Sequence, residues 1–311
     1  MIGQHVVLVT TLCLLGSMGT AGAASPVLFA TLDQGRAALI ARDDLVMRLS
    51  PFDRAARLKT DRDVSEREYL EFVGNSVLPW ENDTKKERVA RAVGFVQKRF
   101  RDLSIRFPDE ILVVRTTGRE EGGASYTRGN VIVLPDNILV NQDQDLAQLI
   151  GHEIFHNLSR NDESLRTNLY KTIGFEPCLE FLFPAVLAPR KITNPDAPKN
   201  DHRIKVKYRG QPAWAVPVLY AAVDKYDRKK GGEFFDYLEF RLALTSVADI
   251  PNNANASFVQ VEEVEGFFEQ VGRNTDYIIH PEEILADNFA LLIVGQRSCL
   301  RRQFLQRYYG C

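Results

Sequence analysis

The amino-acid sequence predicts an α+β fold that is rich in helices, with a small mixed sheet and an N-terminal helical layer. Apolar residues recur at helical spacing within residues 32–105, and two stretches typical of strands follow at 110–118 and 125–135. No strong linker, internal repeat or low-complexity tract interrupts the chain. We therefore predict one main unit that is preceded by an N-terminal helical layer and contains a large insertion.

The composition of the 311 residues is that of an ordinary globular protein. Apolar residues make up 45% of the chain and charged residues 26%, which argues against wholesale disorder. The 39 basic and 41 acidic side chains nearly balance, so neither a nucleic acid nor an anionic membrane surface is expected as the main partner.

The N-terminal segment differs from this average. Residues 6–16 are apolar, and Ala21-Gly22-Ala23 fits the small-x-small pattern at which secretory signals are cleaved. The apolar run is too short for a membrane span of about 20 residues. We predict a signal peptide over residues 1–24, an exported protein (periplasmic or extracellular), and no stable membrane span after cleavage. Two of three remaining cysteines could then pair, in any combination: Cys178, Cys299 and Cys311.

The helical layer is predicted over residues 25–108. Ser65 and Glu68 form a capping-box pattern at the start of one helix. A second helix follows the expected N-cap Asp83, and its apolar face comprises Val89, Val93, Val96 and Phe100.

The remaining chain, residues 109–311, is predicted to hold an insertion at about 184–257. The strands at 110–118 and 125–135 are expected to be joined by a turn at Gly122-Gly123. The later segments are predicted, in order, as a helix capped by Asn141 or Asp143, a proline-rich loop (184–200), a hairpin that turns at Arg209-Gly210, and helices again from Glu233 on, interrupted by a polar loop (249–257).

The segment "LAQLIGHEIFHNLSRND" carries the strongest chemical signal. His152 and His156 are four residues apart, so on a helix both imidazoles project from one side. That spacing allows both to bind one tetrahedral zinc ion, Zn2+. Glu153 lies beside the open position of such a metal, where it can act as general base. A stripe of apolar residues would pack the other face of the helix on a core: Leu146, Ile150, Ile154 and Leu158.

A zinc site needs a third protein ligand, and residues 280–295 supply the best candidate. Glu283 and Asp287 are four apart on one helical face, so Glu283 could bind zinc while Asp287 holds a ligand histidine in place. Glu282 is the weaker choice, because Ala286 stands where its supporting partner would be. Pro281 suits the first turn of this helix.

Asp162, six residues after His156, is a rival third ligand, at the metzincin position. That arrangement needs a sharp turn, usually at glycine, but Ser159 stands there. It also needs a downstream methionine turn, whereas the three methionines, Met1, Met18 and Met47, all lie upstream.

The motif pair His152-Glu153-x-x-His156 and Glu283-x-x-Ala286-Asp287 resembles that of the gluzincin zinc peptidases, which include thermolysin and the CAAX-prenyl proteases. The resemblance covers the two motif helices and the preceding strand, and it implies a zincin-like catalytic domain. It also implies that strand 125–135 is an edge that could bind a peptide or protein substrate by main-chain hydrogen bonds. The donor to a transition-state oxyanion stays open among four residues: Tyr277, His280, His202 and Tyr208.

We therefore predict an exported zinc metallopeptidase that hydrolyses peptide bonds with zinc-activated water and Glu153 as general base. One alternative is a catalytically inactive, zinc-stabilised binding protein on a zincin scaffold, against which the intact Glu153 argues. Another is a zinc amidase that acts on non-protein amides, such as cell-wall material.

Overall fold

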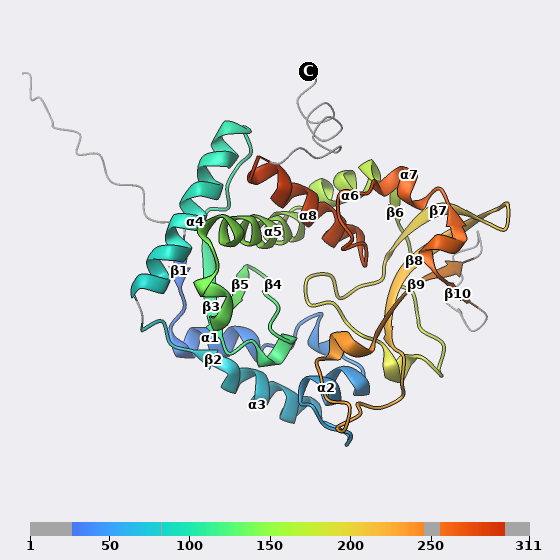
Figure 1. Cartoon of the computed structure of the whole chain (residues 1–311), viewed down its shortest axis with the longest axis horizontal. Coiled ribbons are helices and arrows are strands. Elements are labelled where there is room, and N and C mark those ends of the chain that lie inside the picture. The colour runs from blue at the N-terminus through green and yellow to red at the C-terminus, as the bar shows by residue number, and fades with distance from the viewer. Residues whose placement is uncertain (1–26, 82, 246–255, 296–311) are drawn as a thin grey trace, which may run out of the picture.

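The computed structural model describes residues 27–81, 83–245 and 256–295 (Figure 1). It combines helices and strands, as predicted, but the strands form two sheets rather than one small mixed sheet. The expected signal peptide and three of the four cysteines, Cys13, Cys299 and Cys311, lie outside these residues. Among the described helices, none has both the length and the apolarity needed to cross a bilayer.

Four α-helices form within the predicted N-terminal helical layer, together with two short strands. The Ser65 hydroxyl accepts from the Glu68 backbone N–H, and the Glu68 carboxylate accepts from the Ser65 N–H, so the capping box is reciprocal. The four predicted apolar side chains of the helix that begins at Asp83 are buried. The helices of the layer are α1 (Leu32–Leu39), α2 (Pro51–Arg57), α3 (Glu66–Ser76) and α4 (Asp83–Asp102).

The first sheet differs from its prediction in pairing. The stretch 125–135 is not one strand but a tight hairpin, and its second half pairs in parallel with 111–116. The turn at Gly122-Gly123 therefore does not join a two-stranded hairpin. Strand order is β1-β3-β5-β4, with β2 against β3. Of the stretch 125–135, therefore, only β4 is an edge strand, whereas β5 lies inside the sheet. The strands are β1 (Val27–Phe29), β2 (Val77–Leu78), β3 (Ile111–Thr116), β4 (Tyr126–Arg128) and β5 (Val131–Pro135).

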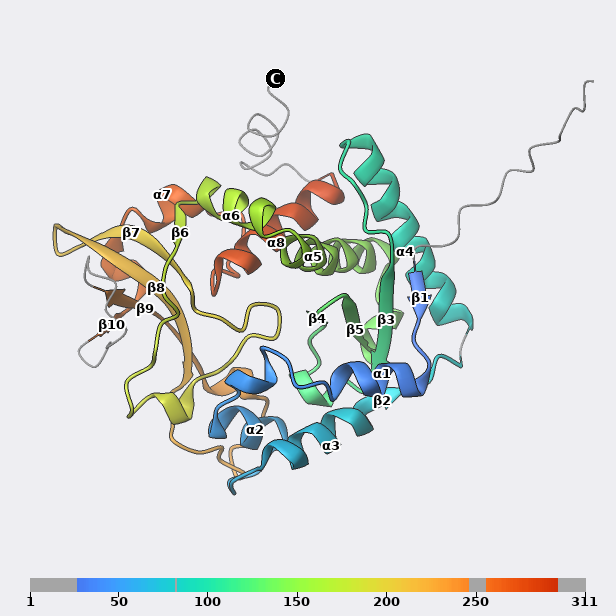
Figure 2. The same ribbon diagram turned by 180° about the vertical axis from the view of Figure 1, so that it is seen from behind.

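The second sheet stands on the other side of the molecule (Figures 1 and 2). Its order is β10-β9-β8-β7-β11, with β6 also pairing β7, and the hairpin turn at Arg209-Gly210 is confirmed. The helical prediction from Glu233 on is wrong where β9 and β10 form, because their side chains pack between sheet neighbours. The strands are β6 (Phe175–Pro177), β7 (His202–Tyr208), β8 (Gln211–Ala221), β9 (Leu238–Thr245), β10 (Ser257–Val259) and β11 (Val264–Glu265).

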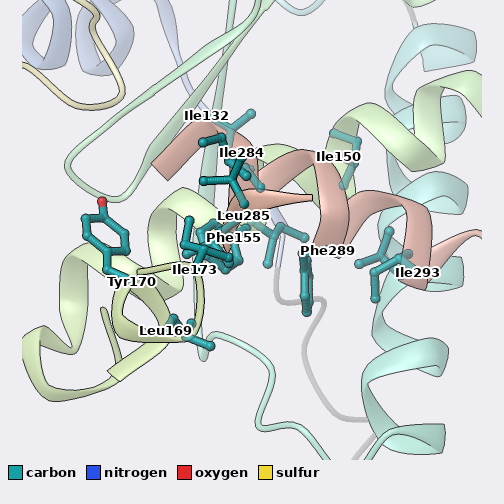
Figure 3. Packing of buried hydrophobic residues seen from close by; sticks show 14 of the residues in the cluster. Ile132, Ile150, Phe155, Leu169, Tyr170, Ile173, Ile284, Leu285, Phe289 and Ile293 are labelled. Atoms are coloured by element: carbon teal, nitrogen blue, oxygen red, sulfur yellow. The ribbon is translucent and has the colours of Figure 1, made fainter. Parts of the chain in front are cut away.

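Three helices lie beside the two sheets: α5 (Asp143–Asn161), α6 (Glu163–Thr172) and α8 (Pro281–Ile293). A short helix, α7 (Phe267–Val271), precedes α8. The N-cap of α5 is Gln142, without a side-chain hydrogen bond, rather than Asn141 or Asp143. Buried apolar side chains join α5, α6 and α8, among them Ile150 and Phe155 of α5 and Phe289 and Ile293 of α8 (Figure 3). Each such buried side chain stabilises the fold by about 1.5–3 kcal/mol, so α5 and α8 are held firmly against each other.

Candidate metal centre

Helix α5 places His152, Glu153 and His156 together, facing α8. The predicted stripe is buried at Leu146, Ile150 and Ile154, but the opposite face is not open to solvent. His156 is 0% exposed and Glu153 2%, while the side chain of His152 retains 13%. The helix is therefore enclosed on both faces, and its polar side chains need partners within the protein.

Helix α8 brings the predicted third residue to the two histidines. Glu283 Oε2 lies 3.2 Å from His152 Nε2 and 3.6 Å from His156 Nε2. The ligand atoms of these three residues all lie within 4.8 Å of one another. In a tetrahedral site with metal–ligand distances of about 2.0–2.1 Å, ligand atoms stand roughly 3.4 Å apart. The three side chains thus have the donor set and spacing of a zinc site.

The Nε2 atom of His156 provides an independent test of this fit. It is buried, and in the described part of the structure it has no hydrogen-bond partner. An unpaired buried polar group costs free energy, so such an atom calls for an explanation. A metal ion between the two imidazoles and Glu283 would satisfy it.

Each histidine is oriented by a carboxylate on its other nitrogen. His152 Nδ1 donates to Asp287 Oδ1 over 2.9 Å, as predicted, and His156 Nδ1 donates to Glu282 Oε1 over 2.9 Å. Because an ionised carboxylate can only accept, these bonds place a proton on each Nδ1. Each Nε2 faces Glu283 and is the nitrogen that a metal ion would bind once it has released any proton it carries. The sequence rated Glu282 a weak ligand candidate; the structure gives it a supporting position that spacing did not reveal.

Glu282 and Glu283, adjacent in sequence, have different partners. Tyr170 OH and Ser159 Oγ also donate to Glu282, so this buried carboxylate is well satisfied. Burial alone would raise the pKa of Glu283, but the charges of His156 and His152 and the hydrogen bond from His152 lower it to about 2. Asn194 Nδ2 donates to Glu283 Oε1 over 2.7 Å and leaves Oε2 facing the histidines.

Glu153 is held by the edge strand of the first sheet. Thr127 Oγ1 of β4 donates to Glu153 Oε2 over 2.7 Å. Burial raises the pKa of the Glu153 carboxyl above its usual value, against the lowering effect of the two histidines. A fixed carboxylate with a raised pKa is suited to accept a proton.

Asp196 is the site residue that the sequence did not indicate. It belongs to the loop between β6 and β7, and its Oδ1 accepts from the Thr127 backbone N–H over 2.6 Å and lies 3.9 Å from His156 Nε2. Burial raises the pKa of Asp196 well above its usual range; His156 opposes this effect and Glu153 adds to it. No helical or strand spacing connects this loop to α5, so the sequence alone carried no signal for this position.

A cavity of about 530 Å³ opens onto these residues. Its lining includes His152, Glu153, Asp196 and Glu283, together with Tyr277, one of the four candidate oxyanion donors. The other three lie in structural positions. His280 caps α8 by accepting from the Glu282 N–H, His202 pairs with Asp201, and Tyr208 ends β7.

The rival third ligand, Asp162, does not join the centre. It ends α5 and caps α6, where its Oδ1 accepts from the Leu165 backbone N–H over 2.9 Å. The metzincin arrangement therefore has no counterpart among the described residues. Comparisons of the chain with protein-family models, curated proteins and solved structures give no match.

Proposed function

We propose that this chain is a zinc-dependent metallopeptidase of the gluzincin type, with His152, His156 and Glu283 as zinc ligands and Glu153 as general base. The observation that carries the proposal is the buried, unpartnered His156 Nε2, 3.6 Å from Glu283 Oε2. Three protein ligands leave one position of a tetrahedral metal open, which is typical of catalytic rather than structural zinc sites.

The chain's own residues can perform the proton transfers of hydrolysis. When bound, zinc supplies a Lewis acid that polarises the scissile carbonyl and acidifies water. Glu153 takes a proton from the attacking water on its carboxylate and returns it to the leaving amine. Tyr277 lines the cavity, and its hydroxyl, protonated at neutral pH, can donate to the developing oxyanion. Asp287 and Glu282 keep both imidazoles in place.

The substrate is proposed to be a peptide or protein that reaches the site through the cavity beside β4. Export of the mature chain remains part of the proposal, and it rests on residues 1–24 alone. Two competing proposals assign zinc another role. In an inactive binding protein zinc would only stabilise the fold, and in an amidase it would support hydrolysis of non-protein amides.

Replacing Glu153 by glutamine tests the mechanism. Glu153→Gln can still accept from Thr127 but cannot take a proton, so zinc should stay bound while turnover falls at least about 10²-fold. The measurements are zinc per chain by elemental analysis and cleavage of casein, a peptide library and peptidoglycan, each with and without chelator. Unchanged peptide cleavage by the fully loaded variant would refute Glu153 as base. Chelator-sensitive cleavage of peptidoglycan alone would favour the amidase. If the zinc-loaded wild type cleaved none of these substrates, the result would favour the inactive binding protein.

A further inference from the structure

The loop of residues 192–199 borders the cavity at the candidate metal centre through Asp196. Asp196 of this loop lines the 530 Å³ cavity and also a second cavity of about 250 Å³, which Arg128 and Gly129 line on the far side. In Figures 1 and 2 the loop reaches from the second sheet toward β4. Because Asp196 borders both cavities and contacts the edge strand β4, we call residues 192–199 the wall.

This wall is anchored as part of the fold. The Ile192 N–H donates to Leu219 O over 3.0 Å, and Asn200 Nδ2 donates to Pro217 O over 3.0 Å, so both ends are fixed to β8. Thr193, 1% exposed, donates through Oγ1 to the buried Asp53 over 2.8 Å. Segments tied by buried hydrogen bonds open rarely. We therefore treat the wall as a permanent boundary of the substrate site.

The wall also occupies the edge strand. The Thr127 N–H, which an added substrate strand would use, already donates to Asp196 Oδ1 over 2.6 Å. An extended peptide lying along β4 could pair up to Thr127 but could not continue beyond it. A substrate bound with its scissile carbonyl at the centre must therefore end at the wall.

The charge of the cavity selects which end of a peptide this is. Five carboxylate side chains line it: Asp145, Glu153, Asp196, Glu283 and Asp287. Among the described residues of the lining there is no lysine or arginine. A peptide's C-terminal carboxylate would be repelled here, whereas its N-terminal ammonium would be attracted.

The distances leave room for about one residue between metal centre and wall. Ligand atoms of Glu153, His156 and Asp196 all lie within 4.8 Å of one another. In an amino acid the amine nitrogen and carbonyl carbon are two bonds apart, roughly 2.5 Å. An amine at Asp196 thus places the carbonyl of the same residue beside Glu153 and the histidines. A carboxylate has about four acceptor sites, so Asp196 can accept from an ammonium as well as from Thr127.

We propose, resting on the peptidase function above, that Asp196 binds the α-ammonium of the substrate and that the chain is an aminopeptidase that removes single N-terminal residues. Water adds to the carbonyl carbon of the first residue, the bond from that carbon to the next nitrogen breaks, and the proton held by Glu153 goes to that nitrogen. The products are one amino acid and a peptide shorter by one residue. The ammonium is only bound and is not consumed.

Paired peptides test this specificity on the zinc-loaded full chain. The same sequence is offered with a free and with an acetylated N-terminus, and products are followed by mass spectrometry. We expect stepwise loss of single residues from the free peptide and a fall in kcat/KM of at least about 10²-fold on acetylation. Cutting of the acetylated peptide at internal bonds at a comparable rate would overturn this inference while leaving the metallopeptidase proposal intact.

Peptide binding provides a second test of this specificity, and it does not depend on catalytic turnover. Zinc-loaded Glu153→Gln protein is titrated with both peptides in a calorimeter, with and without Asp196→Asn. We expect at least about tenfold preference for the free amine, lost in Asp196→Asn and retained in the control Glu163→Gln, which removes an exposed charge outside the cavity. Equal binding of both peptides would contradict the inference even if no cleavage were found. Loss of zinc in Asp196→Asn would instead make Asp196 a metal ligand and overturn its role in amine binding.

Discussion

Two buried clusters of charged side chains contact the loop of residues 192–199, and their charges are neutralised in different ways. In the first, Arg57 donates to both oxygens of Glu121 over 2.8 Å and to Asp53 over 2.6 Å. In the second, the candidate metal centre, the charged partners of the carboxylates are the two histidines. The first cluster is closed by a permanent cation, whereas the second relies on imidazoles, which can release their protons.

This difference separates a closed ion network from a cluster that we propose binds a metal ion. Burial disfavours the charged form of Arg57, yet Glu121 and Asp53 raise its pKa above the usual range, so the cluster is stable as a closed ion network. At the candidate metal centre the carboxylates Glu153, Glu283 and Asp196 lie around His156 Nε2, which has no hydrogen-bond partner among the described residues. Buried acids whose partners are imidazoles rather than lysine or arginine favour the binding of a metal ion, which can replace the imidazole protons.

The largest effect should come from removing the internal cation. Arg57→Met leaves Glu121 and Asp53 buried without their partner, so the free energy of unfolding should fall by about 3–5 kcal/mol. Urea unfolding followed by circular dichroism measures it. The control is Arg67→Met, whose pair with Glu71 is exposed and 3.8 Å apart, and which should change stability by less than about 1 kcal/mol. Similar values for both variants would mean that the Arg57 network contributes no more than a surface pair.

The next effect concerns the cation supplied from outside. At free zinc of 100 to 1,000 times its Kd, the folded chain should gain about 2.7–4.1 kcal/mol, and a chelator should remove this gain. Glu283→Gln should lose most of it because a ligand is gone, whereas Asp162→Ala should keep it. Thermal unfolding with and without zinc gives the answer. An undiminished zinc effect in Glu283→Gln would contradict Glu283 as third ligand.

Glu120 shows a third way to bury an acid, by keeping its proton. It is 1% exposed, and burial raises its pKa to about 7 from 4.5. Between these pH values the folded chain keeps a proton that the unfolded chain releases, so stability should fall as pH rises and level off above pH 7. At 1.36 kcal/mol per pKa unit, the total is up to about 3 kcal/mol. Glu120→Gln should remove this slope in unfolding experiments from pH 4.5 to 8. An unchanged slope would show that Glu120 is not its source, and the exposed control Glu71→Gln should leave it as it is.

The smallest effect should come from the side chains that orient the histidines. Asp287→Asn and Glu282→Gln should each weaken zinc binding by about 10- to 100-fold, since each keeps its shape and loses its negative charge. Competition with a chromogenic chelator measures the affinity, with the exposed Glu163→Gln as control. If Glu282→Gln bound zinc as tightly as wild type, its contact with His156 would be structural only.

Much of the helical structure and half of the candidate site could be predicted from the sequence. The capping box at Ser65 and the burial of Val89 to Phe100 follow from local periodicity, which sequence displays directly. The second sheet was harder to predict, because the chain after Glu233 has a pattern compatible with helix, and its pairing with β8 decides for a strand. The parallel pairing of β3 with β5 depends likewise on contacts between distant segments.

At the candidate site the sequence by itself determined the spacings, four residues from His152 to His156 and four from Glu283 to Asp287, because one helix turn converts spacing into a shared face. Only the tertiary structure decided which carboxylate meets which nitrogen, with Glu283 between the histidines and Glu282 behind His156. It alone also brought Asp196 to Thr127. Those contacts depend on how α8 crosses α5 and where a long loop is anchored, and no local period in the chain encodes either.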